Sequence, residues 1–259
     1  MNEMKVDHEI WGNIPLLHIY NEQSATKEAP TVIFLHGFTS AKEHNLHYAY
    51  QLVNKGLRVL LPDALLHGER EEELDEVQLS LRFWEIVLTS IEEVQFLRNQ
   101  LLEKGLAKEG EIGLSGTSMG GIVTLGALKV YPWIKTAAVM MGSPAYVELA
   151  KEQIAGIEEK GFKIPLNDEE LERMYKTLSR FDLSKEPEGL LGRPVFFWHG
   201  KKDQMVPFKP THEFYKLLQK DYYQDHPEDL AFMVDSSSGH KVSRAGMLAG
   251  TAFLADHLA

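Results

Sequence analysis

The sequence predicts an α/β fold with a mainly parallel sheet and helices on both faces. Short apolar runs typical of buried strands alternate with helical patterns along most of the chain. Such alternation favours parallel pairing, with both faces of the sheet covered. The N-terminus departs from this pattern, because Val6 to Trp11 and Ile14 to Tyr20 flank Gly12-Asn13 and predict an antiparallel hairpin.

Six further strands and several helices are predicted in order along the chain. The strands are 31–35, 58–61, 111–114, 136–141, 194–198 and 230–234. Helical patterns cover 46–55, 74–104, 121–128 and 214–220. The pattern from Leu74 to Lys104 is long for one helix, so we expect a break within it.

Residues 116–120 read Gly-Thr-Ser-Met-Gly, which matches the Gly-x-Ser-x-Gly nucleophile elbow. A strand pattern precedes the motif and an apolar, helix-compatible stretch follows it. This context suits a tight strand-to-helix turn that lifts one side chain above the sheet. Gly116 and Gly120 would remove Cβ atoms where that turn meets neighbouring backbone. The motif therefore predicts Ser118 as a nucleophile.

A serine hydroxyl needs an adjacent base, usually a histidine oriented by a carboxylate. Asp203 follows the strand predicted at 194–198, and His240 follows the strand predicted at 230–234. Ligands and catalytic groups of open α/β sheets gather at the carboxyl ends of strands. We therefore predict a catalytic triad of Ser118, Asp203 and His240.

Motifs over most of the chain resemble one superfamily. They are His36-Gly37-Phe38, Pro62-Asp63 with His67-Gly68-Glu69-Arg70, Gly116 to Gly120, His199-Gly200 to Asp203 with Val206-Pro207, and Gly239-His240. With them the chain resembles the α/β-hydrolase superfamily, and within it the bacterial esterase-like members near the dienelactone hydrolase and prolyl oligopeptidase branch. Leu66-His67-Gly68 departs from the Gly-His-Gly turn that is frequent there.

The resemblance implies an α/β-hydrolase fold and a carboxylesterase-like serine hydrolase. It also implies an oxyanion hole formed by two backbone N–H groups, one from the loop after the first parallel strand and one from the residue after the nucleophile. By position these donors are Phe38 and Met119.

Composition limits the classes of partner. With 27 basic and 38 acidic residues the formal charge is −11, which disfavours nucleic acids and anionic membrane surfaces. The chain has no cysteine, which excludes thiol catalysis, and its N-terminus shows no secretory signal, so we expect a cytoplasmic protein. No metal-binding or nucleotide-binding motif is apparent, and hydrolysis requires no cofactor.

About fifty residues between Met141 and Pro194 do not follow the alternation of strand and helix. Helical patterns at 147–160 and 169–180 argue against a structureless loop. The resemblance suggests a small helical cap at about 144–192, inserted in a single domain of residues 1–259. Five of its apolar residues could either shape a substrate pocket or only pack the cap onto the core: Phe162, Ile164, Met174, Tyr175 and Phe181.

Other residues compete for catalytic roles. Asp182 and Asp235 are rivals of Asp203, but neither follows the penultimate strand at loop distance. His36 and His199 suit structural roles, and His67 suits the ordering of a loop more than contact with substrate. Arg70 suits a salt bridge with the acidic residues around Glu69 to Glu73 as well as it suits a substrate carboxylate.

These observations predict hydrolysis of small to medium carboxylic esters through an acyl-enzyme intermediate. The alternatives are thioesters, lactones and short peptide amides as substrates of the same machinery. A non-catalytic, ligand-binding relative of the same fold is the alternative of a different class. The sequence carries no expectation about oligomeric state.

Overall fold

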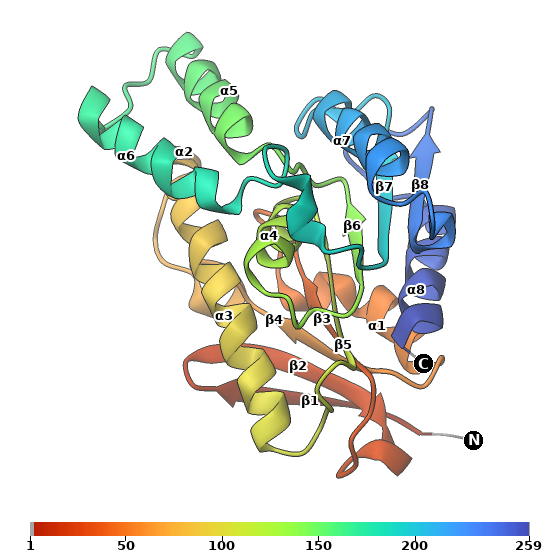
Figure 1. Ribbon diagram of the computed structural model, residues 1–259. Helices are drawn as coiled ribbons and strands as arrows, with labels where there is room; N and C mark the ends of the chain where they lie inside the picture. Colours follow the sequence, from red (N-terminus) through yellow and green to blue (C-terminus); the bar gives the residue numbers. More distant parts are fainter. Residues whose placement is uncertain (1–2, 259) are drawn as a thin grey trace.

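The computed structural model describes residues 3–258, so residues 1, 2 and 259 of the predicted domain lie outside it. Its centre is an eight-stranded sheet in the order β1-β2-β4-β3-β5-β6-β7-β8 (Figure 1). β1 and β2 pair antiparallel, and β2 pairs antiparallel with β4. All pairings from β4 through β8 are parallel. The predicted hairpin and mainly parallel sheet are confirmed.

The strands lie close to the predicted ranges. They are β1 (Met4–Trp11), β2 (Ile14–Asn21), β3 (Thr31–Leu35), β4 (Arg58–Pro62), β5 (Ile112–Thr117), β6 (Ala137–Met140), β7 (Val195–Gly200) and β8 (Leu230–Asp235). The helices are α1 (Leu46–Val53), α2 (Glu76–Leu81), α3 (Phe83–Glu103), α4 (Met119–Val130), α5 (Tyr146–Glu159), α6 (Asp168–Leu178), α7 (Phe208–Asp221) and α8 (Arg244–Leu258).

Alternating strand residues build a separate core on each face of the sheet. Ile33, Leu60 and Leu114 pack in one core with α3, α4 and α7. Val32 and Val59 belong to the other core, which is closed by α1 and α8. Both faces are therefore covered by helices, as the near-continuous apolar strand patterns predict.

One helical feature was expected from the sequence and one was not. The long pattern from Leu74 divides at Arg82 into α2 and α3, so the expected break is present. α8 is not among the predicted elements. Its buried residues include Gly246, Gly250 and Thr251, which are poor helix formers, so local sequence preference for this helix is weak.

The carboxyl ends of β3, β5, β7 and β8 lie on one edge of the sheet because these strands are parallel. α5 and α6 pack together beyond this edge, at the end of the molecule opposite the β1–β2 hairpin (Figure 1). In the described part of the chain, no helix combines the length and apolar character required to cross a membrane.

Candidate active site

Ser118 lies at the turn between β5 and α4. Its backbone has φ 54° and ψ −115°, a conformation that non-glycine residues rarely adopt. The Ser118 N–H donates to the carbonyl of Met140 at the end of β6 at 2.9 Å, and its carbonyl accepts from Ile122 in α4 at 2.9 Å. Both neighbouring elements therefore hold the strained residue in place.

Two glycines make this turn possible. A Cβ atom on Gly116 would lie 2.5 Å from the backbone of Gly120. A Cβ atom on Gly120 would lie 2.2 Å from the carbonyl oxygen of Leu35, at the end of β3. These distances are far inside van der Waals contact, so the turn accepts only glycine at both positions.

Ser118, His240 and Asp203 form a continuous chain of hydrogen bonds. His240 Nε2 lies 2.7 Å from Ser118 Oγ, and His240 Nδ1 lies 2.8 Å from Asp203 Oδ2. An ionised carboxylate accepts only, so Nδ1 carries the hydrogen, and Nε2 is left to accept the hydrogen of the serine hydroxyl. The three residues come from the loops after β5, β7 and β8, so the structure brings the three predicted triad residues together.

Asp203 is held as an anion although its carboxylate is fully buried. Burial alone would raise its pKa. Hydrogen bonds from His199, His240 and the Val206 N–H outweigh this effect and hold the pKa of Asp203 well below its usual range. Its Oδ1 also accepts from the Met205 N–H, so the carboxylate is fixed in orientation as well as in charge.

The loops that carry Asp203 and His240 are joined directly. The Lys202 N–H donates to the Ser238 carbonyl at 3.0 Å, and Lys201 donates to the Asp235 carbonyl at 2.8 Å. This approach requires Gly200, because a Cβ atom there would lie 2.3 Å from the Gly239 carbonyl oxygen. The glycine in His199-Gly200 thus allows the two loops to meet.

The predicted oxyanion donors lie beside Ser118. β3 pairs with β5 so that Leu35 faces Gly116, and the loop from His36 to Thr39 therefore begins next to the elbow. Within residues 3–258, neither the Phe38 N–H nor the Met119 N–H donates to another protein group. Both backbone donors remain available for a ligand.

Two neutral histidines hold the oxyanion loop against the loop after β4. His36 Nε2 accepts from the Ala64 N–H at 3.0 Å, and His67 Nε2 accepts from the Thr39 N–H at 3.0 Å. Each ring places Nδ1 at 2.8 Å from a backbone carbonyl, of Gly37 and Leu65 respectively. Burial is the main reason why the pKa of His36 is lowered to about 4 and that of His67 is also lowered. The structure gives both histidines the ordering role expected from the sequence.

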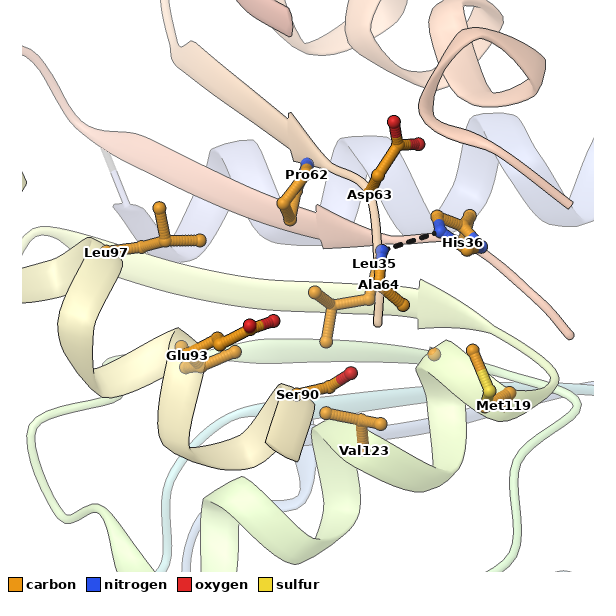
Figure 2. Close-up of a pocket in the computed structure, with 12 residues that line it drawn as sticks. Leu35, His36, Pro62, Asp63, Ala64, Ser90, Glu93, Leu97, Met119 and Val123 are labelled. Atoms are coloured by element: carbon orange, nitrogen blue, oxygen red, sulfur yellow. Dashed lines mark hydrogen bonds between the residues drawn. The ribbon is translucent and has the colours of Figure 1, made fainter. Parts of the chain in front are cut away.

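Close packing surrounds His36. Figure 2 shows its bond to the Ala64 backbone beside a cavity of about 10 Å³ between the ends of β3 and β4 and helices α3 and α4. A cavity of this size holds no more than about one water molecule. Met119 lines the same cavity, so the loop that starts at His36 and the first residue of α4 pack around one small space.

A buried ion pair fixes the base of the same loops. Asp63 accepts from the Lys42 ammonium at 2.6 Å and from the backbone N–H groups of Lys42 and Glu69 at 2.9 and 3.0 Å. Asp63 and Lys42 are almost fully buried. Because the charges are paired and hydrogen-bonded, they can stay ionised inside the protein.

We expect the neutral state of His36 to make stability depend on pH. Its folded pKa of about 4 lies below the ordinary 6.5, so its contribution is full above about pH 6.5 and is lost as pH falls toward 4. The loss should be on the order of 3 kcal/mol of unfolding free energy. Urea unfolding between pH 7.5 and 4.5 checks this.

His36→Gln is the matched variant for that measurement, because it removes the titrating group. His18 and His67 also have lowered pKa values, so the wild-type curve contains their contributions too. The variant should therefore show a flatter dependence than the wild type. The same dependence of unfolding free energy on pH in both proteins would contradict the role given to the neutral state of His36.

A cavity of about 530 Å³ opens beside the triad. Its apolar lining includes Phe38, Phe83, Ile122, Ile157 and Val206, and its polar lining includes Ser118, His240, Glu76, Ser80, Gln153 and Lys160. Glu76, Ser80 and Phe83 were not predicted at this site from the sequence. The expected break in the helical pattern near Arg82 was the sequence feature that could have indicated these residues, because the break places them at the site.

The competing residues have structural partners. Asp182 is buried and accepts from the N–H groups of Val147 and Ser184, so it fixes the start of α5. Asp235 accepts from Ser237 and Ser238 and shapes the turn before His240. Arg70 forms a two-bond ion pair with Glu93 of α3, at 3.0 and 2.8 Å. The suggested pairing of Arg70 with its acidic neighbours in sequence was therefore wrong.

The five apolar residues of segment 144–192 divide into three groups. Ile164 and Met174 line a second, smaller cavity, whereas Phe162 is 47% exposed. Phe181 stacks with Tyr146, and Tyr175 lies under the ammonium of Lys151.

Across residues 3–258, no group of three His, Cys, Asp or Glu residues is arranged to hold a metal ion.

Comparisons with known proteins show the family of the chain. The model of the prolyl oligopeptidase family matches residues 89–258, which is most of the chain and includes all three triad residues. The chain belongs to the prolyl oligopeptidase family. YitV of Bacillus subtilis (strain 168) is 49% identical over 245 residues, covering 95% of this chain and 96% of that protein. Esterase YjfP of Escherichia coli (strain K12) is 31% identical over 207 residues, covering 79% and 80%.

The fold of this prolyl oligopeptidase family member also occurs in distant relatives. TT1662 from Thermus thermophilus has a TM-score of 0.76 at 21% identity, with 99% of this chain and 98% of that chain covered. The predicted α/β-hydrolase fold is therefore confirmed, and the chain is a hydrolase of the α/β-hydrolase type.

Proposed function

We propose that this protein hydrolyses small to medium carboxylic esters with Ser118 as nucleophile, His240 as general base and acid, and Asp203 as the residue that orients His240. The observation that carries the proposal is the hydrogen-bond chain of 2.7 and 2.8 Å that ends at the 530 Å³ cavity. The name of Esterase YjfP supports the same class of substrate.

The reaction proceeds in two halves. His240 Nε2 takes the hydroxyl proton as Ser118 Oγ bonds to the ester carbonyl carbon. The resulting oxyanion accepts hydrogen bonds from the Phe38 and Met119 N–H groups. The bond to the leaving oxygen then breaks, and His240 gives its proton to the departing alcohol. Water, deprotonated by His240, attacks the acyl-enzyme and releases the acid and free Ser118.

The electrostatics of the site suit this sequence of steps. The Asp203 carboxylate is ionised and buried, so it stabilises the positive charge that His240 acquires in each half-reaction. The oxyanion donors are backbone groups in rigid elements, so little reorganisation accompanies the reaction.

We also propose that residues 144–192 form a cap within a single catalytic domain. In support, Gln153, Gly156, Ile157 and Lys160 from α5 and the residue after it line the cavity that contains Ser118. A cytoplasmic place of action and the absence of a cofactor remain predictions from the sequence.

A direct assay tests the proposal. Purified protein should release p-nitrophenol from p-nitrophenyl acetate and butyrate, and a thioester, a lactone and a dipeptide amide tested in parallel define the bond that is cleaved. Turnover of the amide but not of the esters would favour a peptidase. No turnover of any of them by folded protein would favour the non-catalytic relative.

A further inference from the structure

A second cavity of about 120 Å³ lies between the α2–α3 junction and the helices α5 and α6. Its lining side chains are apolar except for Ser80, Gln153 and the indole N–H of Trp84, and no charged residue is among them. Its apolar lining includes Ile154 of α5, Met174 of α6 and Ile164 between these helices. We call this space the distal chamber.

The distal chamber adjoins the cavity that holds Ser118. Ser80, Gln153 and Ile157 line both spaces, so these three residues form a shared neck. A ligand whose reacting carbon lies at Ser118 would reach the chamber by passing these three side chains. The two polar residues of the neck, Ser80 and Gln153, lie between the apolar chamber and the reaction site, which has to admit water.

The order of the strands indicates which part of an ester extends there. His240 follows β8 and protonates the leaving alcohol, so the alcohol lies on the β7–β8 side of Ser118, where Met205 and Val206 line the cavity. The oxyanion loop follows β3, and the α2–α3 junction follows β4, on the opposite side of β5. The wall of the distal chamber that the α2–α3 junction forms therefore lies on the acyl side.

We propose that the distal chamber binds the far end of an acyl chain, and that the substrates are esters of unbranched, medium-length fatty acids. This inference rests on the proposed esterase function. A chain with a charged end would lose hydration in the chamber without gaining a partner, because no charged residue lines it. A linear hydrocarbon end matches the apolar side chains of the chamber in chemistry, and its small cross-section suits passage between the neck residues.

Acyl preference should show this directly. Each methylene that enters an apolar pocket changes kcat/KM by about 10-fold to 200-fold. We expect wild-type kcat/KM to be at least about tenfold higher for p-nitrophenyl octanoate than for p-nitrophenyl acetate.

Met174→Trp tests the chamber by filling it from α6, and Phe162→Trp is the matched control. Phe162 belongs to the same segment, is 47% exposed and lines neither cavity. Met174→Trp should lower kcat/KM for octanoate by about tenfold or more and leave acetate unchanged. Phe162→Trp should keep the wild-type profile. Ile154→Phe fills the chamber from α5 and is the second test variant, to be used if Met174→Trp does not fold.

Two outcomes would overturn the proposal. One is an unchanged octanoate-to-acetate ratio in both folded chamber variants. The other is a selective loss on octyl acetate, measured by acid release, with methyl octanoate unaffected, because the chamber would then hold the alcohol.

A binding measurement separates this proposal from the esterase function itself. Ser118→Ala should bind methyl octanoate more tightly than methyl acetate, as followed by tryptophan fluorescence, and adding Met174→Trp should remove the difference. If these binding results are obtained but the wild-type protein hydrolyses no ester, the acyl-binding role of the chamber stands and the proposed esterase function is rejected. Turnover of acetate with equal binding of both esters would retain the function and reject the chamber.

Discussion

Ser118→Ala should abolish ester turnover while the protein stays folded. The hydroxyl is the group that bonds to the carbonyl carbon, and its loss leaves His240 with no nucleophile to activate. In subtilisin, the loss of the corresponding serine lowers kcat by about 10⁶. We expect a loss of that order in kcat for p-nitrophenyl butyrate, with the unfolding midpoint in urea little changed.

Ser115→Ala is the matched serine-to-alanine control. Ser115 lies in β5 three residues before Ser118, but its hydroxyl is buried and donates to the Ala138 carbonyl at 2.8 Å. Its removal should lower stability and leave kcat near the wild-type value. A large loss of kcat in folded Ser115→Ala, together with an active Ser118→Ala, would contradict the assignment of the nucleophile.

Asp203→Asn should lower kcat by about 10⁴, as the equivalent change does in the serine-protease triad. The amide can donate to His240 Nδ1, which favours the tautomer with the hydrogen on Nε2 and leaves Nε2 unable to accept the serine proton. It also removes the negative charge that stabilises protonated His240. Steady-state kinetics with p-nitrophenyl butyrate measure the loss.

Asp235→Asn provides the comparison for Asp203. The Asp235 carboxylate accepts hydrogen bonds from the turn residues Ser237 and Ser238, and an asparagine oxygen can accept the same backbone hydrogen bonds. We expect a far smaller loss of kcat than in Asp203→Asn. The reverse order of the two losses would identify Asp235 as the orienting carboxylate.

The strand positions and the order of the site residues could be predicted from the sequence because they depend on local patterns. The strand at 31–35 was predicted with the bounds that β3 has, since five apolar or β-branched residues precede the His36-Gly37 loop. Ser118, Asp203 and His240 each follow a predicted strand. Parallel strands bring such positions to one edge, so their proximity followed from topology.

Features that depend on the direction of side chains could not be predicted in this way. Phe162 and Met174 have similar apolar character in the sequence, yet Phe162 is exposed and Met174 lines the distal chamber. The partner of Arg70 is Glu93, which lies 23 residues away in sequence on a different helix. Such contacts depend on how helices pack, which a single sequence does not specify.

Labelling by a fluorophosphonate tests the central claim most directly, because the probe reacts only with a serine that a neighbouring base has activated. Wild-type protein should gain one adduct, and peptide mass spectrometry should locate it on Ser118. Ser118→Ala should remain unlabelled, and Ser115→Ala should label as the wild type does. Labelling that persists in Ser118→Ala, or folded wild-type protein that gains no adduct, would contradict the proposed mechanism.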